Sequence, residues 1–335
     1  MNVDLSTTFL GLRLDCPLVA SAGPLTANRD NLRRLEDAGA GAAVLPSLFE
    51  EQIQREEMAV HWLHEFQTDS FAESLSYFPE MESYNTGPDS YLTLIQEAKQ
   101  SLSMPVIGSL NGVSSGGWVS YARMIQQAGA DALELNIYFL PTRAEQTGQE
   151  LEEQYLELVA QVRSCLTIPL AVKTGPYFSA LPNMARRLVQ AGADGLVLFN
   201  RFPHPNVDLE TLSVRPHLEL SHPYELLMRL RWTAVLRNQL TASLAITGGV
   251  HTAHDAVKAL LVGADAAMMT TILLKHGPDR LRVIREGLYA WLEENDYQSV
   301  AQLKGSMSLE NCPDPTAFER ANYMKALTSY TGPFI

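Results

Sequence analysis

A short junction between a helix and a strand recurs four times and constrains the fold more than any other feature of the chain. Each copy places a glycine after an amphipathic helical pattern and just before a short apolar run, as in Ala38-Gly39-Ala40, Ala128-Gly129-Ala130-Asp131, Ala191-Gly192-Ala193-Asp194 and Gly263-Ala264-Asp265. The glycine suits the position after a helix end, where φ is positive. The uninterrupted apolar runs that follow are typical of parallel strands covered on both faces.

Four further apolar runs complete a set of eight. They cover 17–21, 105–109, 169–173 and 243–247, and join the runs at 41–45, 131–136, 194–199 and 265–269. Eight strands alternating with helices over about 260 residues predict an α/β protein, a (β/α)8 TIM barrel with a parallel eight-stranded sheet. An open doubly wound sheet is the alternative, but it more often has a glycine-rich fingerprint after its first strand. The segment 21–25 fits no such motif.

The spacing of the strands also predicts how the chain is organised. We expect a single domain over 1–335, with the barrel at about 17–297 and an appendage at about 298–335. The spacings 46–104 and 200–223 are too long for plain loops, and the second of them is expected to form a hairpin or lid. Insertions after barrel strands lie at the C-terminal face, where they cover an active site. The appendage could pack across the barrel bottom or against a neighbouring molecule.

Composition excludes several classes of function. Acidic residues number 38 and basic ones 25, for a net charge of −13, and no basic block indicates nucleic-acid binding. No run of about 18 apolar residues predicts a membrane span. The N-terminus has no basic region and includes Asp4 and Asp15, so we expect no signal peptide. Three cysteines, an odd number in a long chain, favour a reducing cytoplasm over a disulfide framework.

The ends of the predicted strands hold amides, hydroxyls and one lysine. In a barrel these ends face the reaction, and here they supply Ser21, Ser47, Asn111, Asn136, Lys173, Asn200, Gly248, Gly249, Thr270 and Thr271. Such a set lacks the parts for metal hydrolysis, paired-carboxylate glycosidase chemistry or a Ser-His-Asp triad. Glu134, inside the fourth strand, is interpreted as a paired buried acid rather than a catalyst.

Lys173 is the most informative single residue. It ends an apolar strand, where an ammonium is costly to bury without an anion or an electron-rich partner. Three interpretations remain open. Lys173 could be structural, reaching solvent or pairing with a strand acid; it could form a Schiff base, as in aldolases; or it could neutralise charge on a reduced cofactor.

A phosphate site and a planar ring are both indicated at the same face. Gly248 and Gly249 follow the seventh strand and Thr270-Thr271 follow the eighth, where barrels commonly bind phosphate with main-chain N–H groups. Asn111, Asn136 and Asn200 each offer a donor and an acceptor to a ring. With Lys173 they point to a nucleotide-like cofactor with a conjugated ring, and flavin mononucleotide (FMN) fits.

The chain resembles the dihydroorotate dehydrogenase family of FMN barrels to about residue 300. The matching segments, in the family's order and spacing, are 17–24, 107–112, 133–136, 172–176, 220–223, 246–250 and 275–278. The resemblance implies that the isoalloxazine ring is lined by Ala20, Ser21, Ala22, Gly23, Ser47, Asn111, Asn136, Lys173 and Asn200. It implies that ribityl and phosphate are held by Ser221, Gly248, Gly249, Thr270 and Thr271. It further implies a homodimer, with Lys173, Asn136 and Asn200 as the catalytic residues.

One departure from the family concerns its general base. Members that oxidise dihydroorotate have a Cys or Ser three residues beyond the fourth-strand Asn, where this chain has Phe139. A base must reach the proton and have a suitable pKa, and its loss commonly costs about 10²–10⁴-fold in rate. None of Cys16, Cys165 or Cys312 lies at a strand end there. Tyr138 is a candidate acid or else buried packing.

Other departures affect the surroundings of the site. The family's lysine at the end of strand two is Pro46 here, a serine after the sixth-strand Asn is Arg201, and a small residue near the phosphate is His222. Asn85 is a candidate match for a substrate-binding asparagine, at a different local spacing. The pair His61 and His64 has no evident third ligand, so no metal site is predicted.

The sequence therefore predicts a cytoplasmic FMN-dependent oxidoreductase acting on a CH–CH group of a small molecule. Its nearest reaction is the conversion of dihydroorotate to orotate in pyrimidine biosynthesis, with a substrate that could have diverged. Two alternatives remain. One is a catalytically altered flavin-binding subunit that exchanges electrons with a partner protein, and the other is a Schiff-base lyase using Lys173.

Overall fold

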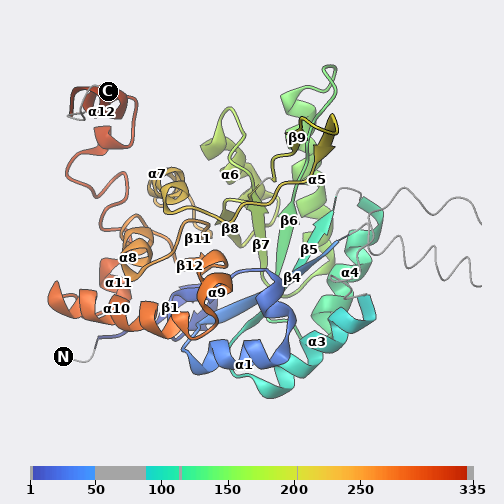
Figure 1. Ribbon diagram of the computed structural model, residues 1–335, viewed down its shortest axis with the longest axis horizontal. Coiled ribbons are helices and arrows are strands. Elements are labelled where there is room, and N and C mark those ends of the chain that lie inside the picture. Colours follow the sequence, from blue (N-terminus) through green and yellow to red (C-terminus); the bar gives the residue numbers. More distant parts are fainter. Residues whose placement is uncertain (1–2, 50–87, 113–114, 202, 330–335) are drawn as a thin grey trace, which may run out of the picture.

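Eight parallel strands form a closed barrel. The computed structural model describes residues 3–49, 88–112, 115–201 and 203–329, and its barrel strands follow the order β11-β12-β3-β4-β5-β6-β7-β8 (Figure 1). Their bounds are β3 Leu18–Ala20, β4 Ala42–Phe49, β5 Val106–Gly112, β6 Ala132–Ile137, β7 Leu170–Thr174, β8 Gly195–Leu198, β11 Ser243–Thr247 and β12 Ala266–Met269. Each of the eight predicted runs is a barrel strand. The predicted (β/α)8 TIM barrel is confirmed.

Helices surround the barrel in the expected alternation. They are α1 Arg29–Asp37, α3 Pro88–Ser101, α4 Ser115–Gln127, α5 Gly148–Cys165, α6 Leu181–Gln190, α7 Leu226–Leu236, α8 Ala253–Leu261, α9 Thr271–His276 and α10 Arg280–Glu294. A 3-10 turn, η1 (Pro24–Ala27), precedes α1. The short α9 is followed by α10, which packs on α8 and donates a hydrogen bond from Arg282 Nη2 to Asp37 O. Helix α10 thereby closes the ring between α8 and α1.

The recurring junction has a physical explanation in the hydrogen bonds at the barrel bottom. Its glycines, Gly39, Gly129, Gly192 and Gly263, all have φ between +89° and +115°, which confirms the expected position after a helix end. In three junctions the following aspartate accepts the N–H of the preceding strand, at 2.7–2.8 Å, in the pairs Asp131–Val106, Asp194–Leu170 and Asp265–Leu244. Each of these carboxylates also pairs with a basic side chain, namely Lys99, Arg163 and Arg237 respectively.

Two strands extend further than the sequence predicts. Strand β4 continues beyond residue 45 to Phe49, and its register with β5 shifts between Val44 and Ser47. Pro46 lies inside this irregularity, because proline has no N–H to give to a regular ladder. Strand β5 runs to Gly112, so Asn111 belongs to the strand rather than to the loop after it. The predicted ends at 45 and 109 were therefore wrong.

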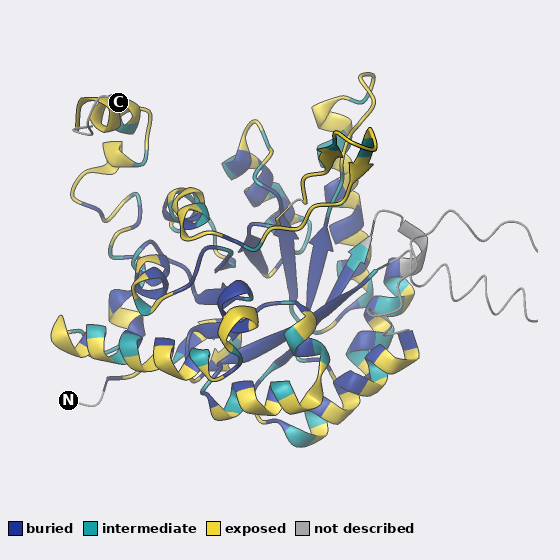
Figure 2. Cartoon of the chain, viewed as in Figure 1, coloured by how far each residue is buried: buried dark blue, intermediate teal, exposed yellow. Residues whose placement is uncertain are grey.

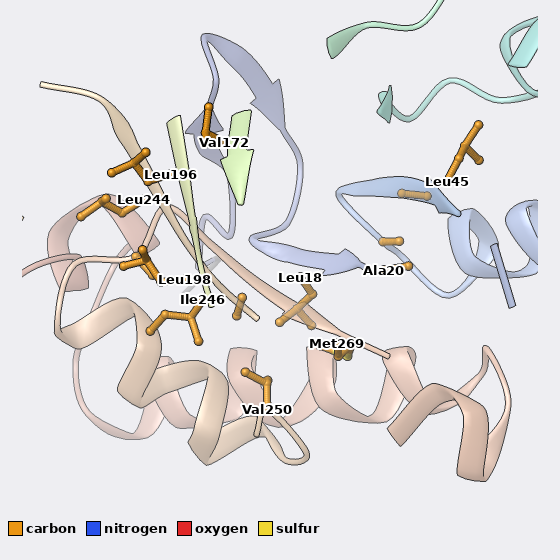
Figure 3. Packing of buried hydrophobic residues seen from close by; sticks show 14 of the residues in the cluster. Leu18, Ala20, Leu45, Val172, Leu196, Leu198, Leu244, Ile246, Val250 and Met269 are labelled. Atoms are coloured by element: carbon orange, nitrogen blue, oxygen red, sulfur yellow. The ribbon is translucent and has the colours of Figure 1, made fainter. Parts of the chain in front are cut away.

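Apolar side chains fill both sides of the barrel wall. Outward-facing residues pack against the helices, and Figure 3 shows the neighbouring pairs Leu196–Leu244 and Leu198–Ile246. The lower interior holds small and branched side chains, closed from below by Phe9, Leu10 and Leu14 of the hairpin formed by β1 (Thr7–Phe9) and β2 (Leu12–Leu14). Figure 2 shows the buried strands inside the exposed outer faces of the helices.

The second insertion and the appendage both reach the C-terminal face. Strands β9 (Asn206–Asp208) and β10 (Ser213–Arg215) pair antiparallel, which confirms a hairpin in 200–223. A 3-10 turn, η2 (Pro223–Glu225), then leads into α7.

Most of the first insertion, residues 50–87, lies outside the described residues, and this segment includes His61, His64 and Asn85. None of the described helices is long and apolar enough to cross a membrane.

The appendage runs from the barrel bottom to the barrel mouth. It contains α11 (Val300–Leu303), η3 (Pro315–Ala317) and α12 (Ala321–Ser329). Lys304 Nζ lies 2.6 Å from Asp265 at the bottom, and Leu309 N donates to Ala234 O of α7 at 3.0 Å. Helix α12 then lies beyond α7, on the side of the strand ends (Figure 1). The sequence predicted the contact at the bottom as one of two options, and it did not predict the approach to the mouth.

We expect Gly129→Ala to lower the free energy of unfolding by about 1–2 kcal/mol, because its φ of +102° strains a residue that has a Cβ. The nearest atom to an added Cβ, Lys99 Cγ, is 3.7 Å away, so no clash contributes. Urea unfolding measures the change. The matched control is Gly148→Ala in the first turn of α5, where nothing lies within 4 Å and stability should be unchanged or higher. Equal effects of the two substitutions would contradict the strain argument.

Candidate active site

The barrel interior changes from apolar to polar toward the strand ends. Residues two apart on a strand point to the same side, and Val19, Ile107, Ala171 and Ala245 in the lower interior are followed by Ser21, Ser109, Lys173 and Thr247. We call the buried polar side chains at this level the polar layer: Ser21, Ser47, Ser109, Glu134, Asn136, Lys173 and Thr247. Apolar residues thus fill the lower barrel, and hydrogen-bonding groups line its upper end.

Several residues that the sequence placed around a planar ring meet in this layer. Asn200 Nδ2 donates to Asn136 Oδ1 at 2.5 Å, and Asn136 Nδ2 donates to Ser47 Oγ at 3.4 Å. Ser47 Oγ in turn lies 2.8 Å from Ser109 Oγ. Asn111 is the β5 partner of Asn136 in the ladder. Three strands and the loop after β8 therefore bring amide and hydroxyl groups to one level, a donor set that suits the edge of a heterocycle.

Lys173 pairs with Glu134 inside the barrel. Nζ lies 3.2 Å from Glu134 Oε1, and the two residues are 7% and 1% exposed. Glu134 is thus the paired buried acid that the sequence predicted, and Lys173 does not reach solvent. Glu134 Oε2 is buried, and no residue in the described part of the chain hydrogen-bonds to it. An ammonium has three donors, so this pair leaves polar capacity at the level where a ligand ring would lie.

The predicted phosphate residues lie together beyond β11 and β12. Ser221 N and Oγ approach Thr271 Oγ1 at 3.1 and 2.9 Å, and Ser221 Oγ lies 3.1 Å from His251 Nε2. His251 is thus a further residue of this site. His251 is buried, and burial lowers its pKa below the usual value, which favours the neutral ring at neutral pH. No motif in the sequence marks this histidine, because only the fold brings it to Ser221.

The Gly248-Gly249 turn is packed so closely that it admits no side chain. Both residues have positive φ, +90° and +82°. An added Cβ would lie 2.8 Å from Arg229 Nη2 at Gly248 and 2.5 Å from Leu226 N at Gly249. The turn therefore packs against Arg229 and the start of α7 and itself has no side chain, as in cradles that bind phosphate oxygens through main-chain N–H groups.

The remaining predicted cofactor residues are on the β3 side of the barrel mouth. Ser21 Oγ lies 3.2 Å from Thr247 Oγ1, and Ala22 packs against the interior cluster. An added Cβ on Gly23 would meet Thr270 Cγ2 at 2.8 Å, so these two residues adjoin. Ala20 belongs to the outer cluster that faces the helices. Only the main chain of Ala20 could therefore face a cofactor.

An aromatic cluster occupies the region of the missing base. Phe139 packs edge-on against Tyr155 of α5, with ring centroids 4.8 Å apart, and Tyr155 does the same with Phe178 at 5.3 Å. Burial raises the pKa of Tyr155 above its usual value, which makes it a poor base. Tyr138 beside this cluster is half-buried. The position where the family has its general base is therefore occupied by Phe139, a packed aromatic side chain that cannot accept a proton.

A pocket of about 950 Å³ opens beside Asn200. It lies between the loops after β7 and β8, the start of α7 and the appendage, and its lining includes Tyr177, Asn200, Arg201, Glu225, Phe318 and Asn322. Arg201 Nε donates to Glu225 Oε2 at 3.0 Å, and the exposed His222 pairs with Glu219 at 2.8 Å. Arg201 and His222, two departures from the family, are thus both at this mouth.

The groups present fit an FMN molecule. The polar layer and the adjoining Asn111 and Asn200 offer amides, hydroxyls and an ammonium to a flat ring, and the Gly-Gly cradle with Ser221 and Thr271 offers donors to a phosphate. Among the described residues, no group of three or more His, Cys, Asp or Glu side chains is arranged to hold a metal ion. A TIM barrel with such a site is the architecture expected of a flavin-dependent oxidoreductase.

Comparison with known proteins gives the family. The dihydroorotate dehydrogenase family profile matches residues 4–292, so the chain belongs to this family, whose enzymes depend on FMN. The chain is 25% identical to the dihydroorotate dehydrogenase B (NAD(+)) catalytic subunit of Thermoplasma acidophilum, over 90% of this chain and 98% of that protein. It is 27% identical to a putative dihydroorotate dehydrogenase A (fumarate) of Aeropyrum pernix, over 90% and 97%.

A third relative is named for a different activity. The NAD-dependent dihydropyrimidine dehydrogenase subunit PreA of Escherichia coli K12 is 24% identical, over 91% of this chain and 77% of that protein. The predicted resemblance and the predicted cofactor are confirmed at the level of the family. The relatives act on small molecules, and they are named for different substrates and electron acceptors.

We expect Glu134→Gln to lower the free energy of unfolding of the flavin-free protein by about 3 kcal/mol, because it leaves the Lys173 ammonium buried without its carboxylate. The double variant Glu134→Gln with Lys173→Met removes both charges and should recover part of that loss. Urea unfolding of the single and double variants measures the coupling. Strictly additive losses would show that the two side chains do not stabilise each other.

Proposed function

We propose that the chain is an FMN-dependent oxidoreductase that acts on a CH–CH group of a small heterocycle and has diverged from efficient dihydroorotate oxidation. The observation that carries this proposal is the contrast between two parts of one site. The polar layer, with Asn111 and Asn200 beside it, retains the amides and the lysine that the family resemblance assigns to the ring, whereas the base position is occupied by Phe139 in an aromatic cluster. FMN supplies two-electron chemistry when bound.

Each proposed catalytic residue has a role that its position supports. The Lys173 ammonium would stabilise negative charge on the ring edge that it faces. Asn136 and Asn200 hydrogen-bond to each other at 2.5 Å, so each orients the other's amide, and together they would position a substrate at the mouth. Ser47 fixes the Asn136 amide from the other side. Preorganised polar groups of this kind cost no rearrangement at the moment of reaction.

The surroundings of Lys173 argue against the Schiff-base lyase. A nucleophilic lysine must be neutral, and sites that use one place it in an apolar pocket or beside another cation. Here Nζ lies 3.2 Å from the Glu134 carboxylate, which is neither of these two environments. We therefore favour electrostatic stabilisation by Lys173 over covalent catalysis.

A second candidate function is that of a flavin-binding subunit within a redox complex. Two of the relatives described above are named as subunits of larger enzymes: the Thermoplasma acidophilum catalytic subunit and Escherichia coli PreA. A chain of this type could form a homodimer and exchange electrons with a partner protein. Anaerobic titration separates the two functions. Reduction of the bound flavin by a dihydropyrimidine supports the enzyme, and reduction only through an added protein partner supports the subunit.

We expect Lys173→Met to bind FMN more weakly and to lower the flavin midpoint potential by roughly 30–60 mV, the equivalent of about 1.4–2.8 kcal/mol for a two-electron couple. The reason is that the reduced ring would lose the nearby ammonium. Spectroelectrochemistry measures the potential. Lys99→Met is the matched control, because Lys99 pairs with Asp131 at the opposite end of the barrel at 2.7 Å. An unchanged potential in Lys173→Met would remove the basis for the flavin role of this lysine.

We expect wild-type protein to be reduced slowly by dihydroorotate, and Phe139→Cys to raise that rate at least about tenfold, toward the 10²–10⁴-fold that a general base contributes. Stopped-flow absorbance of the FMN-loaded proteins under anaerobic conditions measures the rate. Phe139→Leu controls for loss of the ring contact with Tyr155 without adding a base. Rapid reduction of the wild type would contradict the proposed divergence from dihydroorotate.

A further inference from the structure

A buried arginine lies directly behind the glycine turn of the phosphate cradle. Arg229, from the first turns of α7, has a side chain only 3% exposed. Its guanidinium faces Gly248, where an added Cβ would meet Nη2 at 2.8 Å and Cζ and Nε at 3.0 Å. Arg229 lies in a helix and not at a strand end, so no motif in the sequence indicates a role for it.

Arg229 connects three elements through main-chain carbonyl groups. Nε donates to Thr247 O at the end of β11, Nη1 donates to Glu225 O at 2.7 Å, and Nη2 donates to Phe199 O at 3.4 Å, just after β8. The guanidinium therefore fixes the residue before Gly248 and the residue before Asn200 at the same time. One side chain thus positions the phosphate turn and one of the ring-lining amides.

The charge of Arg229 is incompletely compensated by the described residues. Its nearest carboxylate oxygen, Glu225 Oε2, is 3.7 Å away, beyond hydrogen-bond length. That same oxygen accepts from Arg201 Nε at 3.0 Å, and Glu225 Oε1 accepts from His222 N at 2.9 Å. Two guanidinium groups thus share one carboxylate. Glu219, the next acid, pairs with His222 and is largely exposed.

A buried cation in this state is costly unless an anion approaches it. Burial lowers the pKa of Arg229 to about 10, and the group stays charged at neutral pH. Gly248, against which the guanidinium packs, belongs to the same cradle as Gly249, Ser221 and Thr271, and Ser221 is hydrogen-bonded both to Thr271 and to His251 just beyond the turn. A phosphate monoester there would bring up to two negative charges, whereas a ligand without phosphate would bring none.

We propose that Arg229 is a positioning and charge-compensating residue for the phosphate of FMN, acting through the Gly248-Gly249 turn. The proposal rests on the proposed function and makes a more specific claim. It says that Arg229 makes the site select a phosphorylated flavin over riboflavin, which has the same ring and ribityl chain but no phosphate.

The test compares FMN and riboflavin binding to the flavin-free protein by fluorescence quenching. In Arg229→Met we expect FMN affinity to fall about 10- to 100-fold relative to riboflavin affinity, since only FMN has the compensating charge. Arg229→Lys, which keeps the charge and loses the fork of carbonyl contacts, should fall between. Glu225→Gln removes a competing carboxylate, so the preference for FMN should stay the same or increase. This third variant keeps the test valid if Arg229→Met fails to fold.

The control is Arg163→Met, because Arg163 also donates to main-chain oxygens, Leu166 O and Ile168 O, but at the barrel bottom. It should leave the FMN-to-riboflavin ratio unchanged. Equal losses of FMN and riboflavin affinity in Arg229→Met, or a reduced FMN preference in Glu225→Gln, would overturn the role of Arg229. Failure of the proposed function looks different, because the wild type would then bind neither flavin.

Discussion

A closed parallel barrel has a single interior, and everything that points into it must be either packed or hydrogen-bonded. In this chain the lower interior is sealed by apolar residues such as Phe9 and Leu14, and the upper interior is polar. The Lys173–Glu134 pair lies at the boundary between the apolar and the polar interior, because both charged side chains are inside the barrel and are compensated mainly by each other. Such a pair is tolerated in a protein interior only when its geometry is good. The apolar lower interior supplies packing that stabilises the barrel, so that its upper end can hold polar groups for a ligand.

The fold could be predicted from sequence because its repeating unit is local. Each junction places a glycine and a strand within a few residues, and in the three junctions that also have an aspartate the structure shows the same two aspartate contacts. Features that depend on distant residues could not be predicted. The bulge at Pro46 arises from pairing with β5. The course of the appendage depends on hydrogen bonds to α7 and α8 that leave no mark on its own sequence.

The site shows the same division between local and distant information. Asn136, Asn200, Lys173 and the Gly248-Gly249 turn were predicted because each ends a recognisable strand or begins the loop after one. His251 and Arg229 are also buried in the site, yet they come from a loop and a helix whose sequences contain no recognisable motif. Their importance arises only when the chain closes and brings them to Ser221 and Gly248. A residue that acts through a main-chain turn is invisible to any motif.

The path of the appendage ties two ends of the molecule together. One strap of chain is salt-bridged at Asp265 beneath the barrel, follows α7 and ends in α12 beside the 950 Å³ pocket. The lining of this pocket thus includes residues of the appendage, which are synthesised after the barrel. The barrel could therefore fold and bind FMN before the appendage packs beside the pocket.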